Sequence, residues 1–318
     1  MRDGFGREVR YLRVSLTDLC NLRCRYCMPA EGVPKKRHNE MLTEEETLRA
    51  VRTAASLGVT KVRLTGGEPL VKRNLLSICR GITAIPEIET LALTTNGALL
   101  TRELAENLRT AGVSRINISL DTLDAEKYRS ITRMGDLADA LRGVENALAA
   151  GFPRVKLNAV LIGGFNDDEI GALAALTMRL PLDVRFIELM PMHGCQGFDE
   201  AAFVPCSRVL EALPEAVPEA PDGSVARLYR LPGATGRLGL ISPLSDHFCA
   251  RCDRLRLTAD GCLKPCLHAA AEYRIKGLSD EEMRAVMERA ILAKPRWHGV
   301  LSAEHRSETL RDMNEIGG

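Results

Sequence analysis

The sequence contains no hydrophobic run long enough to cross a membrane and no excess of either charge. None of its apolar stretches approaches the roughly 20 residues that a membrane-spanning helix needs. Its 43 basic and 42 acidic residues nearly cancel. No overall basic field therefore favours nucleic acid, and an anionic ligand would have to be met by local arginines. We expect neither a membrane protein nor a nucleic-acid-binding protein.

The beginning of the chain also lacks the apolar segment of a signal peptide, because residues 1–10 are rich in charge. The chain contains ten cysteines, and we expect a cytoplasmic protein with reduced thiols that are used for metal rather than for disulfides. Low-complexity segments and solenoid repeats are absent from the sequence. Its 318 residues exceed the usual size of one compact domain, which predicts a barrel with an appendage or two domains.

Strand-like and helix-like segments alternate six times in the first part of the chain. The expected strands are residues 9–16, 61–65, 90–95, 115–120, 155–162 and 184–189. The expected helices follow Thr43, Pro69 and Thr101, end near Gly151, and begin again at Asn166. This order predicts a parallel α/β sheet with right-handed crossovers, curled into a partial barrel whose working loops lie at the carboxyl ends of the strands.

The pattern changes after residue 191. A short helix is expected at 207–213, antiparallel strands at 225–231 and 237–241, and a helix capped by Ser279 that ends near residue 293. Strands at 255–258 and 263–265 flank a hairpin signal at Asp260-Gly261. We place a soft boundary here and expect two regions, 1–191 and 192–318.

Polar and cationic residues alternate with apolar ones along the expected strands. Alternate side chains of a strand face opposite sides, and both faces of a helix-covered parallel sheet should be apolar. The polar face so predicted carries Arg13, Ser15, Arg63, Thr65, Thr94, Asn117, Ser119, Lys156, Asn158 and Arg185. Because buried charges need partners, this face predicts a cation-lined cavity for an anionic ligand. The alternative is that these residues lie at strand ends and extend to solvent.

Three cysteines lie close together at Cys20, Cys24 and Cys27. Thiolates select soft centres such as iron–sulfur clusters or zinc. A closed zinc site wants four ligands, so a lone triplet favours a cluster that leaves one iron open to another ligand. Zinc with a distant fourth ligand, and cysteines buried together by chance, are the alternatives.

A second set of cysteines comprises the pair Cys249 and Cys252 and, across the expected hairpin, Cys266. Three thiols again suit a cluster with an open iron. With Cys262 as a fourth ligand, the same region would form two spaced pairs, as in a zinc ribbon. Spacing alone leaves both options open.

The first spacing, Cys-x3-Cys-x2-Cys with Tyr26 before the last cysteine, resembles the radical S-adenosylmethionine (SAM) enzymes. The second, Cys-x2-Cys-x13-Cys with Arg254-Leu255-Arg256 shortly after the pair, resembles the GTP 3′,8-cyclases of that superfamily. Further resemblance lies in residues 11–15, 27–29, 63–70, 93–97, 117–121 and 185–190 and in the final Gly317-Gly318. Together these stretches cover essentially the whole chain from about Gly4.

The resemblance implies an incomplete (β/α)6 barrel with a C-terminal antiparallel, cluster-binding extension. It implies that Cys20, Cys24 and Cys27 hold a 4Fe–4S cluster whose open iron chelates SAM. It likewise implies a second 4Fe–4S cluster on Cys249, Cys252 and Cys266, facing the guanine of GTP. The implied SAM contacts are Tyr26, Gly67, Ser119 and Met190. The implied GTP contacts are Arg13, Arg63, Thr94, Lys156, Arg254, Leu255 and Arg256, and we add Arg185 because it shares the cavity face.

The activity so implied is cyclisation of GTP, the first step of molybdenum-cofactor synthesis. Reductive cleavage of SAM gives a 5′-deoxyadenosyl radical, which takes hydrogen from the ribose 3′ carbon. The carbon radical then attacks carbon 8 of guanine, giving 3′,8-cyclo-7,8-dihydro-GTP. Gly317 and Gly318 would reach into the site, and the alternative for them is a frayed terminus.

The implied partners are a reductant protein and the downstream cyclic pyranopterin synthase, which receives the product. The chain would act as a monomer or homodimer. Two other functions remain open: a radical SAM enzyme with an auxiliary cluster and another substrate, and a zinc-stabilised nucleotide-binding module without catalysis. Cys79, Cys195, Cys206 and Cys262 have no assigned role.

Overall fold

Six parallel strands form the central part of the sheet, as the alternation in the sequence predicts. A computed structural model describes residues 1–193 and 199–317 of the chain. The strands are β1 (Tyr11–Ser15), β2 (Lys61–Thr65), β3 (Thr90–Thr95), β4 (Val113–Ser119), β5 (Val155–Leu161) and β6 (Leu182–Glu188), neighbours in that order. Each neighbouring pair is parallel. The expected α/β class and partial barrel are confirmed.

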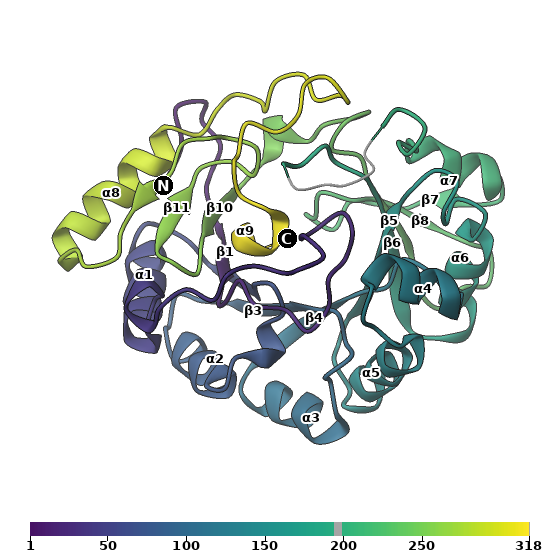
Figure 1. Ribbon diagram of the computed structural model, residues 1–318, viewed down its shortest axis with the longest axis horizontal. Coiled ribbons are helices and arrows are strands. Elements are labelled where there is room, and N and C mark those ends of the chain that lie inside the picture. The colour runs from purple at the N-terminus through teal and green to yellow at the C-terminus, as the bar shows by residue number, and fades with distance from the viewer. Residues whose placement is uncertain (194–198, 318) are drawn as a thin grey trace.

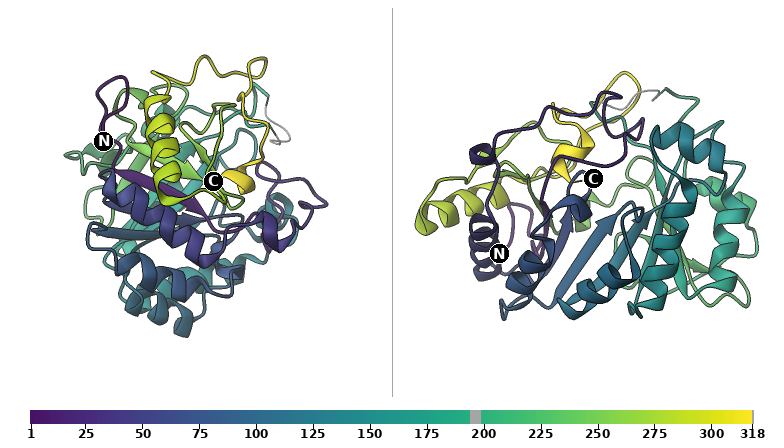
Figure 2. Two further views of the ribbon diagram at one scale, coloured as in Figure 1. Left: turned by 90° about the vertical axis from the view of Figure 1, so that its left-hand side faces the viewer. Right: turned by 60° about the horizontal axis from the view of Figure 1, so that its bottom comes forward.

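Helices cover the outer face of these strands (Figures 1 and 2). They are α1 (Glu44–Ser56), α2 (Leu75–Thr83), α3 (Arg102–Thr110), α4 (Ala125–Thr132), α5 (Leu137–Ala149) and α6 (Ile170–Arg179). Buried side chains such as Leu12, Val62 and Ile82 pack in one core between strands and helices. Because strand residues alternate, the remaining side chains of the strands point to the inner side of the curled sheet.

Capping boxes begin two helices where the sequence predicts them. The Thr43 hydroxyl accepts from the N–H of Glu46 at 3.1 Å, and the Glu46 carboxylate accepts from the N–H of Thr43 at 2.9 Å. Ser279 and Glu282 form the same reciprocal pair ahead of α8 (Asp280–Leu292). Each pair satisfies two N–H groups that have no partner within the helix.

One expected helix start was wrong, and one expected helix end is confirmed. The helix expected from Asn166 begins only at Ile170, because the buried Asn166 amide instead donates to the carbonyls of Asp121 and Val160. The helix expected to end near Gly151 is α5, which ends at Ala149 and is preceded by the shorter α4. Arg133 takes the left-handed conformation, with φ of 63°, and ends α4 before α5 begins.

The C-terminal region adds short strands and helices. They are α7 (Ser207–Ala212), β7 (Val217–Pro218), β8 (Arg227–Arg230), β9 (Leu238–Ile241), β10 (Arg254–Leu257), β11 (Cys262–Lys264), β12 (Tyr273–Arg274), α8 and α9 (Met313–Ile316). Single 3-10 turns occur at His38–Glu40, Pro69–Val71 and Cys249–Arg251. The antiparallel pairs β8–β9 and β10–β11 confirm the expected extension.

These added strands extend both edges of the six-stranded sheet. β9 pairs in parallel with β6, and β10 pairs in parallel with β1. The result is one sheet of twelve strands with the order β12-β11-β10-β1-β2-β3-β4-β5-β6-β9-β8-β7. The division between residues 191 and 192 stays a prediction, and the sheet itself continues across it.

The C-terminal segment returns to the inner side of the partial barrel. Figure 1 shows α9 in yellow near the centre of the molecule. The N–H groups of Ser307 and Thr309 donate to the carbonyls of Pro191 and His268. Ile316 is buried against Leu189 and other apolar residues. The C-terminal segment therefore packs against the inner face of the barrel instead of fraying.

Candidate active site

A single cavity of about 350 Å³ is lined by both cysteine triplets and by the polar face of the strands. The predicted lining residues that border it are Arg13, Arg63, Thr65, Thr94, Asn117, Ser119, Asn158 and Arg185, with Arg254 and Arg256 from β10. β10 pairs with β1 so that Arg256 lies opposite Arg13 and Arg254 opposite Tyr11. Pairing between strands distant in the sequence thus concentrates positive charge at one place.

Three arginines of this cavity are buried and do not extend to solvent, whereas Arg13 and Arg254 are partly exposed. Arg63 is 6 % exposed, Arg185 7 % and Arg256 6 %. Burial, together with repulsion from neighbouring arginines, lowers the pKa of Arg185 and Arg256 to about 10. So much buried positive charge costs folding energy unless an anion compensates it. This arrangement favours an anionic ligand over the strand-end alternative.

Several polar atoms in the cavity wall lack a hydrogen-bond partner among the described residues. They are Asn117 Oδ1, Asn158 Oδ1, Arg185 Nε and Arg254 Nε. Buried polar groups are normally paired. The wall therefore offers both donors and acceptors, which suits a ligand that carries anionic and hydrogen-bonding groups together.

Two predicted contacts lie outside the cavity lining. The Lys156 ammonium lies 3.8 Å from the Asp183 carboxylate, and burial followed by repulsion from Arg185 lowers its pKa to about 7. Leu255 is 1 % exposed and packs in the apolar core, because it alternates with Arg254 and Arg256 along β10. Their roles in ligand binding stay predictions.

The loop after β1 brings Cys20, Cys24 and Cys27 to the cavity wall. Burial raises the pKa of the Cys24 thiol well above its usual value, and Cys27, Asp121 and Cys20 raise it further. Such thiols stay protonated until a metal ion displaces the proton. Three soft donors that converge in a partly enclosed wall fit an iron–sulfur cluster.

The Gly66-Gly67-Glu68 turn packs directly on this cysteine loop. The Gly67 N–H donates to the Thr17 carbonyl at 2.7 Å, and the Glu68 N–H donates to the Leu19 carbonyl at 2.9 Å. The Glu68 carboxylate accepts from Thr95 Oγ1 and from the Asn96 and Leu70 N–H groups. The glycines therefore allow two loops to approach closely, and the carboxylate fixes the ends of β2 and β3 to each other.

Replacing Gly67 with alanine is expected to lower the free energy of unfolding by about 1–3 kcal/mol, as overpacking typically does. A Cβ at Gly67 would lie 2.4 Å from the Leu19 carbonyl oxygen, whereas one at Gly171 in α6 meets nothing within 4 Å. Gly171→Ala is the matched control, and we expect it to be neutral or stabilising. Urea unfolding of both variants tests this, and equal effects would contradict the close packing.

Tyr26, Ser119 and Met190 border the cavity beside the first cysteine triplet. The Tyr26 hydroxyl donates to Asp121 Oδ2 at 2.7 Å, and Asp121 Oδ1 accepts from the N–H of Val160 at 2.9 Å. Burial raises the pKa of Asp121 to about 6. These two hydrogen bonds connect the Tyr26 ring, which belongs to the cysteine loop, to the carboxyl ends of β4 and β5.

The second triplet, Cys249, Cys252 and Cys266, borders the same cavity, whereas Cys262 does not. The buried Lys294 ammonium lies 3.9 Å from Cys252 Sγ and donates to the Pro265 carbonyl at 2.9 Å. Within residues 1–193 and 199–317, no group of three His, Cys, Asp or Glu side chains is arranged around a single metal ion. A 4Fe–4S cluster binds its thiolates through different irons, so three spread thiols suit it.

Tyr11 and Lys61 border the cavity although the sequence analysis did not single them out. Tyr11 lies two residues before Arg13 and Lys61 two before Arg63, so the same alternation contains the signal. The Arg63 Nε–H donates to the Tyr11 hydroxyl, and the Lys61 ammonium lies 4.3 Å from the centre of the Tyr11 ring. The Tyr11 side chain is therefore in contact with two cationic side chains.

Tyr11 is expected to ionise near pH 7. Burial alone would raise its pKa, but Arg63, Arg13, Lys61 and Arg254 together lower it to about 7. Because the folded pKa lies below the unfolded value of about 10, ionisation stabilises the fold increasingly as pH rises from about 7 to 10. That contribution is lost as pH falls through 7.

Near-ultraviolet difference absorbance between the wild type and Tyr11→Phe should show tyrosinate forming near neutral pH. Tyr128→Phe is the control, because burial raises the pKa of Tyr128 instead. A Tyr11 that titrates only near its ordinary value would contradict the predicted effect of the surrounding cations.

The backbone of Gly317 contacts two arginines that line the cavity. Its carbonyl accepts from Arg13 Nη2 and Arg256 Nη1, each at 3.0 Å. Its φ is 70°, and a Cβ there would lie 2.2 Å from Thr65 Oγ1, so only glycine fits. Gly318 and Cys195 lie outside the described residues.

Comparisons with known proteins agree with this arrangement. The sequence model of the Radical SAM superfamily matches residues 14–177, and that of Molybdenum Cofactor Synthesis C matches residues 182–300. Proteins named GTP 3′,8-cyclase from Alkaliphilus metalliredigens and Moorella thermoacetica are 48% and 46% identical to this chain. Each alignment covers 100% of this chain and 100% of the relative.

Solved structures share the fold at low identity. The crystal structure of Streptococcus suis SuiB matches 82% of this chain and 61% of its own, with a TM-score of 0.60 and 15% identity. Methylornithine synthase (PylB) matches 66% of this chain and 63% of its own, with a TM-score of 0.52 and 19% identity. Within residues 1–193 and 199–317, no helix is long and apolar enough to span a membrane.

Proposed function

This chain belongs to the GTP 3′,8-cyclase family of radical SAM enzymes, and from that premise we propose the reaction and the residues that perform it. The reaction converts GTP to (8S)-3′,8-cyclo-7,8-dihydroguanosine 5′-triphosphate and begins molybdenum-cofactor biosynthesis. One observation carries the proposal: both cysteine triplets border one cavity together with a set of buried arginines. Such a cavity offers two sites for soft metal clusters and a site for a triphosphate.

A radical SAM enzyme uses a 4Fe–4S cluster and SAM, and the first triplet fits that cluster. Cys20, Cys24 and Cys27 would hold it, and the cluster with SAM supplies the electron and the 5′-deoxyadenosyl radical that start the reaction. Tyr26, Gly67, Ser119 and Met190 would contact SAM. These four residues border the cavity together with the first triplet, which supports this assignment.

The second triplet would hold a second 4Fe–4S cluster that faces the guanine of GTP. Its support is the donor set: Cys249, Cys252 and Cys266 border the cavity that the arginines also border. Lys294, which lies behind Cys252, would offset the negative charge of thiolate-bound iron. Cys262 would take no part, since it lies away from the cavity wall.

The chain itself binds and orients GTP. Arg13, Arg63, Arg254 and Arg256 would pair with the triphosphate through bidentate guanidinium contacts, together with Thr94, Arg185 and Lys61. Lys156 would contact the triphosphate only if its ammonium left Asp183. Leu255 would contribute indirectly, because its burial in the core holds the neighbouring Arg254 and Arg256 at the cavity. Holding GTP rigidly keeps its ribose 3′ carbon close to its own carbon 8, which lowers the entropic cost of the ring closure.

The remaining assignments follow from the same premise. Electrons would come from a reductant protein, and the product would pass to cyclic pyranopterin synthase. The cytoplasm is the proposed location, because cysteines that hold clusters must stay reduced, and the nine described cysteines are free of disulfides. Monomer and homodimer both remain compatible with the described residues.

An anaerobic assay of the iron–sulfur-reconstituted protein with SAM, a chemical reductant and GTP tests the proposal. Mass spectrometry should detect 5′-deoxyadenosine and an isomer of GTP, with ATP as the control nucleotide. Deoxyadenosine without a cyclised nucleotide would keep the radical SAM class and discard GTP as substrate. Protein that retains zinc, contains no acid-labile sulfide and forms neither product would instead support a nucleotide-binding module.

A further inference from the structure

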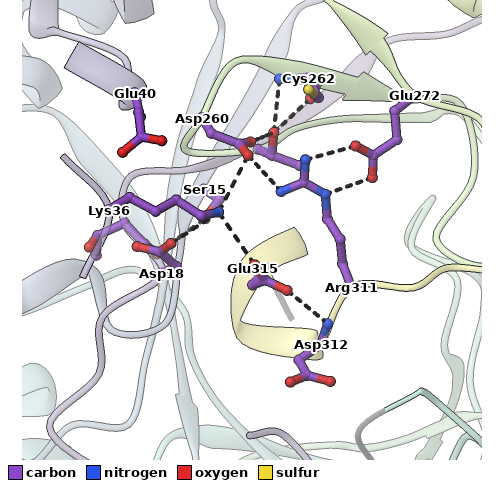
Figure 3. Close-up of polar contacts among 12 residues, drawn as sticks. Ser15, Asp18, Lys36, Glu40, Asp260, Cys262, Glu272, Arg311, Asp312 and Glu315 are labelled. Carbon is purple, nitrogen blue, oxygen red and sulfur yellow. Dashed lines mark hydrogen bonds and ion pairs between the residues drawn. The ribbon is translucent and has the colours of Figure 1, made fainter. Parts of the chain in front are cut away.

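A cluster of charged residues joins the C-terminal segment to the loop after β1 and to the β10–β11 turn (Figure 3). The Lys36 ammonium lies 3.3 Å from carboxylate oxygens of Asp18, Asp260 and Glu315. Asp18 lies two residues before the first cysteine, Asp260 lies in the β10–β11 turn, and Glu315 belongs to α9. One lysine therefore ties three segments that are far apart in the sequence.

Arg311 makes the second connection in this cluster. Its guanidinium binds both Glu272 carboxylate oxygens at 2.7 Å and donates to Asp260 Oδ2 at 2.9 Å. These are charge-assisted and partly bidentate bonds, the strong class of hydrogen bond. The Asp260 carboxylate thus forms ion pairs with both Lys36 and Arg311, so the two contacts belong to one connected network.

Further hydrogen bonds hold the residues between Arg311 and Gly317. The N–H of Asp312 donates to the Glu315 carboxylate at 3.2 Å, and the Asn314 amide donates to the Asp18 carbonyl at 2.9 Å. α9 has only a few residues and cannot be stable alone. Its position must therefore come from these contacts and from the burial of Ile316.

The carbonyl of Gly317 in turn bridges two like charges. Arg13 and Arg256 lie opposite each other on neighbouring strands, and burial together with repulsion from Arg256 lowers the pKa of Arg13. A shared acceptor lets the two guanidinium groups stay adjacent and fixes their directions. The orientation of both arginines therefore depends on where the C-terminal segment is held.

We propose that Lys36 and Arg311 are positioning residues: they clamp α9 so that Gly317 sets the orientation of Arg13 and Arg256 in the nucleotide site. This inference rests on the proposed function for the identity of the nucleotide. The clamp itself rests on the ion pairs alone.

Lys36→Met and Arg311→Met test the clamp in the reconstituted holoenzyme. Hydrogen exchange of the peptide that spans residues 311–317 should become about tenfold faster in both, as expected for loss of a partly buried ion pair. Lys35→Met is the matched control, because Lys35 is the exposed neighbour in the same loop and loses the same charge. Arg311→Lys should be intermediate, since it keeps the charge but not the two-pronged contact with Glu272.

Equilibrium affinity for GTP gives the second readout. Both methionine variants should bind GTP about tenfold more weakly, while SAM affinity stays unchanged, because the bridged arginines belong to the nucleotide site. Unchanged exchange in both variants, or faster exchange with unchanged GTP affinity, would overturn the proposal. A wild type that binds GTP without cyclising it would end the proposed function and leave the clamp to be judged by these two readouts.

Discussion

Replacing Cys24 with alanine is expected to abolish formation of 5′-deoxyadenosine. Cys24 contributes one of three thiols in the first triplet, and burial raises its pKa, as do the neighbouring Cys27 and Cys20. All three thiols border the same cavity, which is where one cluster would be held. Losing one of three protein ligands should leave too few bonds to hold it, so the electron that cleaves SAM has no source.

Iron analysis and mass spectrometry measure this effect together. Iron and acid-labile sulfide should fall by about half, because the proposed second cluster would remain on the second triplet. Cys79→Ala is the control, because Cys79 is fully buried in the apolar core and does not line the cavity that both triplets border. Deoxyadenosine formation that persists in Cys24→Ala would remove the first triplet from its assigned role.

Replacing Cys252 with alanine should remove the cyclised nucleotide while deoxyadenosine still forms. The two triplets border one cavity but come from separate segments, the loop after β1 and the region around β10. Losing the second cluster should therefore spare the first. We expect product to fall below about one hundredth of the wild type, since the guanine would lose its proposed metal contact.

Cys262→Ala separates the cluster from the zinc alternative. A zinc site built on four cysteines would lose metal in Cys262→Ala as well as in Cys252→Ala. A three-thiolate cluster would be lost only in Cys252→Ala. Full product formation by Cys252→Ala would rule out the second triplet as part of the substrate site.

Local periodicity predicted the parts of the fold that depend on neighbouring residues. The alternation in β1 and β2 correctly placed Arg13 and Arg63 on the cavity face, because a strand repeats every second residue. The capping boxes at Thr43 and Ser279 correctly marked the helix starts, because caps act within one turn.

Contacts between distant segments were not predictable in the same way. Nothing in the residues of β10 indicates that it pairs in parallel with β1, more than two hundred positions earlier. Lys156 follows the alternation of β5, yet its ammonium turns toward Asp183, which no periodic pattern reveals. The Lys36 and Arg311 network likewise joins segments that only the tertiary fold brings together.

The attachment of β9 and β10 to opposite edges of the sheet affects how the chain can fold during synthesis. Until β9 leaves the ribosome, β6 is an open edge, and β1 remains open until β10 (Arg254–Leu257) has also emerged. Open edges can pair with other chains, and such exposure is greatest in slow-folding parallel sheets. A nascent chain of this protein therefore needs protection until nearly all of its length has been translated.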